Sequence, residues 1–247
     1  MYKKKTIYGI ITARGGSKSI PNKNIKKIDG KPLVFYSINT SLKSKLIDRT
    51  IITTDSKKIA KIAKNLKCEI PFLRPKKISG DFSTDFQVLE HLDKWLKKND
   101  KVPDYYVHLR PTHPIRDQKV IDHAIKKIIQ NKTFDSLRSF SISKETPYKT
   151  WVKKNKKFFP IIKLKKTSDS HSIPRQLLPV TYWQNGYIDI IKSTTISKKK
   201  SIVGKKILPF ILKQDSYDID YIEELNFLKK NFSKIKKFKN TLKRYPS

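Results

Sequence analysis

The sequence contains one cysteine, Cys68, among 247 residues. A single cysteine excludes both an intrachain disulfide and a zinc site built from cysteines. The five histidines show neither metal-ligand spacing nor a helical HExxH pattern, so they indicate no metal site. With 37% hydrophobic residues and several apolar runs, the chain has the composition needed for a packed core.

Long apolar runs are also missing, and no segment reaches the length that spans a bilayer. The N-terminal run, Ile7 to Ala13, follows a basic start but has no small-residue cleavage site after it. We interpret this run as a strand rather than as a signal peptide. We therefore expect a cytoplasmic protein that does not insert into membranes.

Acidic residues are scarce: 21 Asp and Glu stand against 56 Lys and Arg, which gives a net charge of +35. Such an imbalance is typical of proteins that bind nucleic acid or acidic membranes. The excess is nearly all lysine, whereas base recognition relies on arginine, and no zinc-finger, RNP or basic-zipper pattern is present. We interpret the lysines as solvated surface and expect no specific nucleic-acid partner. A basic nucleic-acid-binding module is kept as the alternative from a different functional class.

Apolar, β-branched segments alternate with segments of helical periodicity, which predicts an α/β fold with a parallel sheet and right-handed crossovers. Helices are expected to begin at Pro32, Ser56, about Thr84, Asp117 and just after Asp220. Strands are expected at residues 7–13, 49–54, 70–73, 104–109, 134–142, 183–191 and 206–212.

The alternation breaks at about residues 144–179, where a β-hairpin with its turn at 153–157 is expected. We interpret this region as an insertion that leaves the main sheet. The prediction is one domain over residues 1–233 that contains the insertion. A basic tail, 234–247, is expected to be weakly ordered because it is rich in lysine.

A basic loop follows the first predicted strand directly. Glycines let a backbone approach a ligand closely, and successive N–H groups can form an anion-binding concavity. Arg14 and Lys23 add positive charge on either side of Gly15 and Gly16. The two best-known phosphate motifs, G-x-x-x-x-G-K-[ST] and G-x-G-x-x-G, are both absent. The loop is predicted to bind phosphates, and a basic surface turn is the alternative.

The string ARGGSKSIPNKNIKKIDGKPL resembles the signature of the sugar-acid cytidylyltransferases, the acylneuraminate cytidylyltransferase (CMP-sialic acid synthetase) family. Further blocks resemble that family in the same order, to about residue 230: TTDS, LRPTHPIR, PRQLLP, NGYIDI and DSYDID. The resemblance implies a Rossmann-like nucleotidyltransferase fold with a predominantly parallel sheet and a small inserted dimerisation subdomain, hence a homodimer. It also implies transfer of CMP from CTP to the anomeric hydroxyl of a 2-keto-3-deoxy sugar acid of the sialic or nonulosonic class, with release of pyrophosphate.

The resemblance further implies roles for individual residues. Sialate enzymes typically carry Gln where this chain has Arg110, while other branches carry Arg, so an octulosonic (KDO-like) acid or another sugar remains an alternative acceptor. Arg175 is suited to pair with a substrate carboxylate because a guanidinium presents a fork of donors. Residues implied to bind the nucleotide are Ala13, Arg14, Gly15, Ser17, Lys23, Asn24, Arg74, Asp81 and Arg110, and those implied to bind the sugar acid are Lys149, Arg175, Gln176 and Asn185.

Two carboxylates, Asp218 and Asp220, flank Ile219. In an extended segment, residues i and i+2 share a face and can hold one hard cation through oxygen. The resemblance implies that this cation is Mg²⁺ or Mn²⁺ and that these aspartates are catalytic together with Arg14 and Lys23. Helix capping is the alternative for the aspartates.

Overall fold

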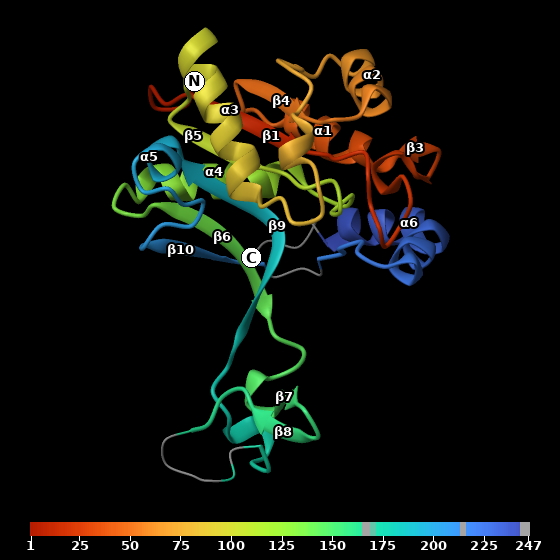
Figure 1. Cartoon of the computed structure of the whole chain (residues 1–247), viewed down its shortest axis with the longest axis vertical. Coiled ribbons are helices and arrows are strands. Elements are labelled where there is room, and N and C mark those ends of the chain that lie inside the picture. The colour runs from red at the N-terminus through yellow and green to blue at the C-terminus, as the bar shows by residue number, and fades with distance from the viewer. Residues whose placement is uncertain (165–168, 170, 213–215, 243–247) are drawn as a thin grey trace.

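The computed structural model describes residues 1–164, 169, 171–212 and 216–242. Its centre is a six-stranded sheet in the order β10-β6-β9-β5-β1-β4 (Figure 1). The strands are β1 (Ile7–Thr12), β4 (Arg49–Thr53), β5 (Tyr105–His108), β6 (Ser136–Ile142), β9 (Tyr182–Lys192) and β10 (Ile207–Ile211).

The sheet is predominantly parallel, as the sequence predicts. β1 runs parallel to β4 and β5, and β10 runs parallel to β6. Only β9 reverses: it lies between β5 and β6 and is antiparallel to both. Because both faces of the sheet are covered, its strands read as nearly continuous apolar runs.

Helices cover the two faces of the sheet. Successive residues of β1 point to opposite faces, so Ile7 joins the cluster around α4 and Tyr8 joins the cluster around α3. Ile11 packs with residues of α1 and α2. The helices are α1 (Leu33–Lys43), α2 (Lys57–Asn65), α3 (Asp85–Asn99), α4 (Gln118–Gln130), α5 (Ser193–Ser197) and α6 (Ile222–Leu242). Within the described part of the chain, every helix is too short or too polar to cross a membrane.

Helix α6 packs against the segment that follows β1. Ile20 and Ile28 from that segment share a buried cluster with Ile219 and Leu225. Two short antiparallel strands, β2 (Lys27–Ile28) and β3 (Lys31–Pro32), form part of the same segment. The segment after β1 and the C-terminal helix are thereby brought together beside the basic loop.

The inserted region forms an arm that projects from the sheet (Figure 1). β6 and β9 continue into it as a pair, after a register shift between Arg138 and Phe140. At its end, β7 (Trp151–Lys154) and β8 (Lys157–Pro160) form the predicted hairpin. Most of its residues are exposed, among them Phe158 (61%). The arm also holds two short 3-10 helices, Pro147–Lys149 and Arg175–Leu177.

Two predicted elements differ in the structure. The strand expected at Ile70–Leu73 is wrong: only isolated bridges occur there, at Glu69 and Leu73. Pro71 lacks an N–H group and so interrupts a ladder between them. Helix α6 is also longer than expected, since it continues past Lys234 to Leu242. Lysine is a good helix former, which is compatible with this extension. Residues 243–247 of the predicted tail lie outside the described residues.

Candidate active site

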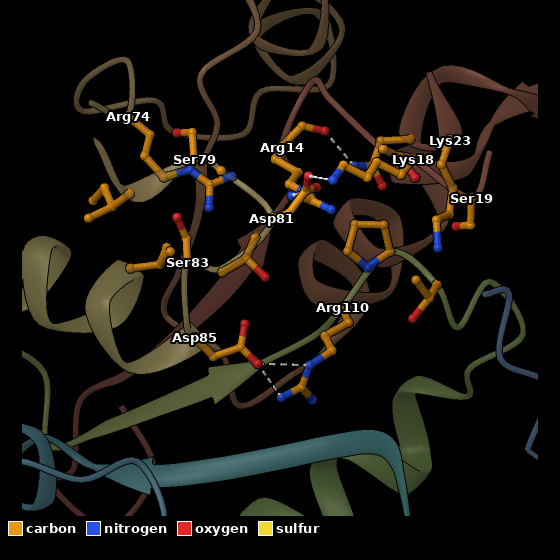
Figure 2. Close-up of a pocket in the computed structure, with 18 of the residues that line it drawn as sticks. Arg14, Lys18, Ser19, Lys23, Arg74, Ser79, Asp81, Ser83, Asp85 and Arg110 are labelled. Carbon is orange, nitrogen blue, oxygen red and sulfur yellow. Dashed lines mark hydrogen bonds and ion pairs between the residues drawn. The ribbon is translucent and has the colours of Figure 1, made fainter. Parts of the chain in front are cut away.

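A cavity of about 550 Å³ opens beyond the carboxyl ends of β1 and β5 (Figure 2). This edge is where open α/β sheets hold ligands. The end of β1 and the basic loop form one wall, and the segment before α3 forms another. The lining residues are Thr12, Arg14, Ser17, Lys18, Ser19, Lys23, Asn24, Arg74, Ile78, Ser79, Gly80, Asp81, Ser83, Asp85, Val88, Arg110, Pro111, Thr112 and Asp220.

The cavity is positively charged. Five cationic side chains line it, against three carboxylates. The carboxylates, Asp81, Asp85 and Asp220, each pair with one or more of the cations. A surplus of fixed positive charge inside a concave site favours a polyanionic ligand such as a polyphosphate.

The basic loop is held in shape from both sides. Asn24 Nδ2 donates to the carbonyl of Arg14 at 2.9 Å, which closes the loop on itself. The Gly15 N–H donates to Asp55 Oδ1 at 2.8 Å, so this amide is used structurally rather than offered to a ligand. A Cβ on Gly15 would lie 3.0 Å from Ser56 Cβ at the start of α2, which is tighter than an ordinary contact, so glycine eases the close approach of the loop to α2.

Lys23 connects the loop to the segment before α6. Its Nζ donates to the Ile219 carbonyl at 2.9 Å and lies 3.4 Å from Asp220 Oδ1. Since Ile219 is buried in the cluster beneath, the ammonium group is fixed at the rim of the cavity. The structure thus brings Lys23 and Asp220, two of the predicted site residues, together.

Asp81 bridges two cations of the loop. Its Oδ1 lies 2.7 Å from Arg14 Nη1, and its Oδ2 lies 2.8 Å from Lys18 Nζ. Hydrogen bonds from Lys18 and Arg14 lower the pKa of the Asp81 carboxyl. The carboxylate thus occupies the position between two cations that a phosphate group would be expected to take.

Arg74 is the cation of the cavity without a carboxylate pair in the described structure. Only 6% of the residue is exposed, and neither its Nε nor its Nη2 has a hydrogen-bond partner among the described residues. Burial lowers the pKa of Arg74. Figure 2 shows its guanidinium beside Ser79, on the side of the cavity away from Lys23. A buried donor left unsatisfied is costly, which favours a ligand with acceptor atoms at this place.

Asp218 and Asp220 lie on either side of the fully buried Ile219, but they face different cavities. Asp220 lines the main cavity, whereas Asp218 lines a second cavity of about 440 Å³ beside the start of α6. Asp218 Oδ1 lies 3.4 Å from His113 Nδ1. The N–H groups of Asp220 and Tyr221 donate to Glu224 Oε2 at 2.6 and 2.9 Å, so Glu224 caps this helix start.

The chain matches the family model described as Cytidylyltransferase over residues 8–237. It belongs to the cytidylyltransferase family. Post-translational flagellin modification protein B of Campylobacter coli is 30% identical over 88% of this chain and 90% of its own length. Pseudaminic acid cytidylyltransferase of Campylobacter jejuni is 35% identical, and that match spans only 50% of this chain and 53% of the relative.

The fold agrees with this family. The solved structure of CMP:2-keto-3-deoxy-manno-octonic acid synthetase complexed with CTP resembles this cytidylyltransferase with a TM-score of 0.69, covering 93% of this chain and 99% of that chain. At 13% identity the likeness shows the fold alone. The predicted Rossmann-like α/β fold is confirmed.

The residues predicted to bind the sugar acid lie apart from the cavity within one chain of this cytidylyltransferase. Lys149, Arg175 and Gln176 are exposed on the arm. Arg175 Nη2 donates to the Ser143 carbonyl at 3.0 Å. Asn185 is buried in β9, where Ser139 donates to its amide oxygen and its Nδ2 donates to Ser141, both at 2.7 Å. Of the predicted nucleotide residues, Ala13 and Gly15 support the loop without lining the cavity.

The sequence did not identify two acidic partners of Arg110, Asp85 in the cavity lining and Asp189 buried behind it. Asp85 and Asp189 both bind Arg110, each at 2.6 Å. Asp85 lies within the Thr84–Gln87 capping box, so in the sequence it looks like an ordinary residue of a helix start. Asp189 lies inside an apolar strand, and a charged residue at such a position was the one signal in the sequence that could have identified it as a site residue.

The pairing of Asp81 predicts its response to substitution. Asp81→Asn keeps the side-chain shape but removes the carboxylate that a phosphate must displace from Arg14 and Lys18. Inorganic pyrophosphate should bind roughly three- to tenfold more tightly, since each such ion pair contributes up to about 1 kcal/mol. Isothermal titration calorimetry measures this change. The control is Asp29→Asn, which makes the same change of charge on an exposed turn away from the cavity. Equal pyrophosphate affinities of the two variants would contradict the idea that Asp81 competes with phosphate for Arg14 and Lys18.

Proposed function

We propose that this chain transfers CMP from CTP to the anomeric hydroxyl of a 2-keto-3-deoxy sugar acid of the nonulosonic class and releases pyrophosphate. The observation that carries the proposal is the cavity itself, where a basic glycine loop and the unpaired, buried Arg74 face one space. The printed names of the relatives, which include pseudaminic and N,N'-diacetyllegionaminic acid enzymes, support an acceptor of this class. We place the reaction in the cytoplasm, where nucleoside triphosphates are available.

The two ends of the cavity suit the two ends of CTP. Arg14, Lys18 and Lys23 lie at one end and match the negative charge of a triphosphate. Arg74 lies at the other end, where its free N–H groups match the acceptor atoms O2 and N3 of a cytosine ring. Such an arrangement would select a base by hydrogen bonds that only the correct acceptor edge can satisfy.

The chemistry requires positioning and neutralisation of charge more than a covalent nucleophile. The acceptor hydroxyl oxygen forms a bond to the α-phosphorus, while the bond from that phosphorus to the bridging oxygen breaks. Negative charge develops on the departing pyrophosphate, and Arg14 and Lys23 are placed to stabilise it. The hydroxyl proton passes to solvent or to a nearby carboxylate, for which Asp220 is the candidate at the rim.

Asp220 lines the main cavity and could hold a hard divalent cation jointly with substrate, whereas Asp218 faces the neighbouring cavity and would have to turn to reach the same ion. No group of three or more metal-ligating side chains occurs among the described residues, so protein ligands alone would not enclose an ion. Mg²⁺ commonly binds through one or two carboxylates plus substrate phosphates. Because Glu224 caps the start of α6, neither aspartate side chain is needed as the helix cap. When bound, Mg²⁺ or Mn²⁺ would offset the charge of the phosphates and of the attacking oxygen.

The arm supports a homodimer. Its exposed apolar side chains include Trp151 (39%), Phe158 (61%) and Trp183 (70%), and an isolated two-stranded hairpin is marginally stable in water. The sugar-acid candidates Lys149 and Arg175 lie on the same arm, outside the cavity of their own chain. A second copy is the occupant that would cover the apolar residues.

A pyrophosphate-release assay tests the activity. CTP, but not UTP, ATP or GTP, should release pyrophosphate with nonulosonic acids, and an octulosonic acid belongs in the panel because of Arg110. Arg14→Ala should lower turnover by about a hundredfold, as loss of a preorganised charge contact does. Its melting temperature should be unchanged. Lys126→Ala, on the exposed side of α4, is the control; a fully active Arg14→Ala enzyme would remove Arg14 from the proposed role.

The metal proposal predicts the dependence of the rate on Mg²⁺. Asp220→Asn and Asp218→Asn keep the side-chain shape, so both variants should melt normally, lose most activity and need far more Mg²⁺ to recover any. Glu224→Gln is the control, because weakening the cap should cost about 1 kcal/mol of stability and leave the Mg²⁺ dependence alone. Initial rates and the Mg²⁺-induced shift in melting temperature with CTP present give the readout. Superimposable Mg²⁺ curves for wild type and both variants would exclude these ligands.

The dimer proposal predicts the mass in solution. Light scattering at micromolar concentration should give twice the 28.9 kDa mass of the chain. Replacing Phe158 and Phe159 together by serine should shift the protein towards the monomer, because both side chains are exposed on the hairpin. Leu42→Ser is the control, because Leu42 is an exposed apolar residue of α1 in the body. A monomeric wild-type protein would overturn the proposal.

A further inference from the structure

Four charged side chains form a chain of ion pairs beneath the cavity. Arg110 Nε and Nη2 donate to Asp85 Oδ2 at 3.2 and 2.6 Å, and Arg110 Nη1 donates to Asp189 Oδ2 at 2.6 Å. The same Asp189 oxygen lies 2.6 Å from Arg138 Nη1. Arg138 Nη2 in turn donates to the Ile202 carbonyl. Asp189 therefore shares one oxygen between two guanidinium groups.

Strand register explains why these residues meet. In β9, Asp189 pairs with His108 of β5 on one side and with Arg138 of β6 on the other. Directly paired residues of antiparallel strands point to the same face of a sheet, so the three side chains form a row. Burial lowers the pKa of His108 to about 4, so this histidine is neutral at pH 7 and leaves both arginines as the counter-ions of Asp189.

The inner pair lies outside the cavity. The side chains of Asp189 and Arg138 are 0% and 1% exposed, and neither lines the cavity, whereas Arg110 and Asp85 do. Two carboxylates and two guanidinium groups balance in charge, yet a buried ionic group generally adds little stability over an apolar one. Removing one member is costly because it leaves a buried charge alone. A balanced buried network of this kind is better suited to fixing a geometry than to adding stability.

We propose that Asp189, supported by Arg138, is a positioning residue that holds the Arg110 guanidinium at the cavity floor for the substrate. A guanidinium has five N–H donors. Three of those of Arg110 are used by Asp85 and Asp189, which leaves two for a ligand. Because Arg138 shares the Asp189 oxygen, Asp189 orients Arg110 without neutralising it fully. This inference rests on the proposed cytidylyl transfer.

A kinetic double-mutant cycle between Arg110→Lys and Asp189→Asn tests the positioning role. Lysine keeps the charge of Arg110 but loses the planar fork, so each single variant should raise KM for CTP or for the sugar acid about tenfold, the scale of one charge-assisted hydrogen bond. Once Arg110 is lysine, Asp189→Asn should have no further effect on KM. Independent, multiplicative effects on KM would overturn the proposal.

A matched control separates positioning from stability. Asp135 is another buried carboxylate of the sheet region, bound by Lys199 at 2.5 Å and by the backbone N–H of Lys205 at 2.8 Å, and it does not line the cavity. Asp135→Asn should lower the melting temperature and leave both KM values unchanged. An Asp189→Asn variant that behaves like Asp135→Asn, with lower stability and wild-type KM, would reduce Asp189 to a structural residue and overturn the proposal.

A charge-balanced variant keeps the test decisive if Asp189→Asn does not fold. Asp189→Asn combined with Arg138→Gln removes one charge of each sign, so no buried charge is left alone. It should fold and still show the raised KM, and a wild-type KM would contradict the proposal. Wild-type turnover with CTP is measured first, and its absence would contradict the proposed function. Turnover without coupling between Arg110 and Asp189 would contradict the positioning role alone.

Discussion

Repulsion between like charges is the constraint on which this site depends. Five cationic side chains line one cavity, and at an effective dielectric constant near 20 two charges 4 Å apart interact by about 4 kcal/mol. The structure offsets this repulsion with carboxylates from separate elements: Asp81 before α3, Asp85 at its start, Asp189 in β9 and Asp220 before α6. In a chain with 21 acidic residues, four at one site is a marked concentration.

These pairs also connect parts of the chain that are distant in sequence. Lys23 reaches the Ile219 carbonyl across 196 positions, while the apolar cluster around Ile20 and Leu225 holds α6 against the same loop. The C-terminal helix is therefore part of the support of the basic loop. Arg74 is the exception in this scheme, because it is buried and has no carboxylate pair among the described residues.

The sequence was sufficient to predict the features that depend on residues close together in the chain. Most strands, the loop after β1 and the hairpin in the insertion follow from local patterns of apolar, glycine and basic residues. The strand at Ile70–Leu73 was wrong because its apolar residues outweighed Pro71 in the pattern. The partners of Arg110 could not be predicted, since Asp85 and Asp189 lie 25 and 79 residues from it and meet it only through helix packing and strand register. The position of the arm relative to the cavity could not be predicted either, although its apolar residues did predict a hairpin.

The arm is attached to the body through two strands only. β6 and β9 stay paired past the register shift as far as Ile142 and Tyr182, so the chain leaves the pair after Ile142 and returns to it at Tyr182. No described residue of 143–181 belongs to the buried clusters of the body, so insertions and deletions there need not disturb the core. A change confined to this segment leaves every residue that lines the cavity in place. The fold thus separates, within one domain, an arm that can change in length from a body whose packing is constrained.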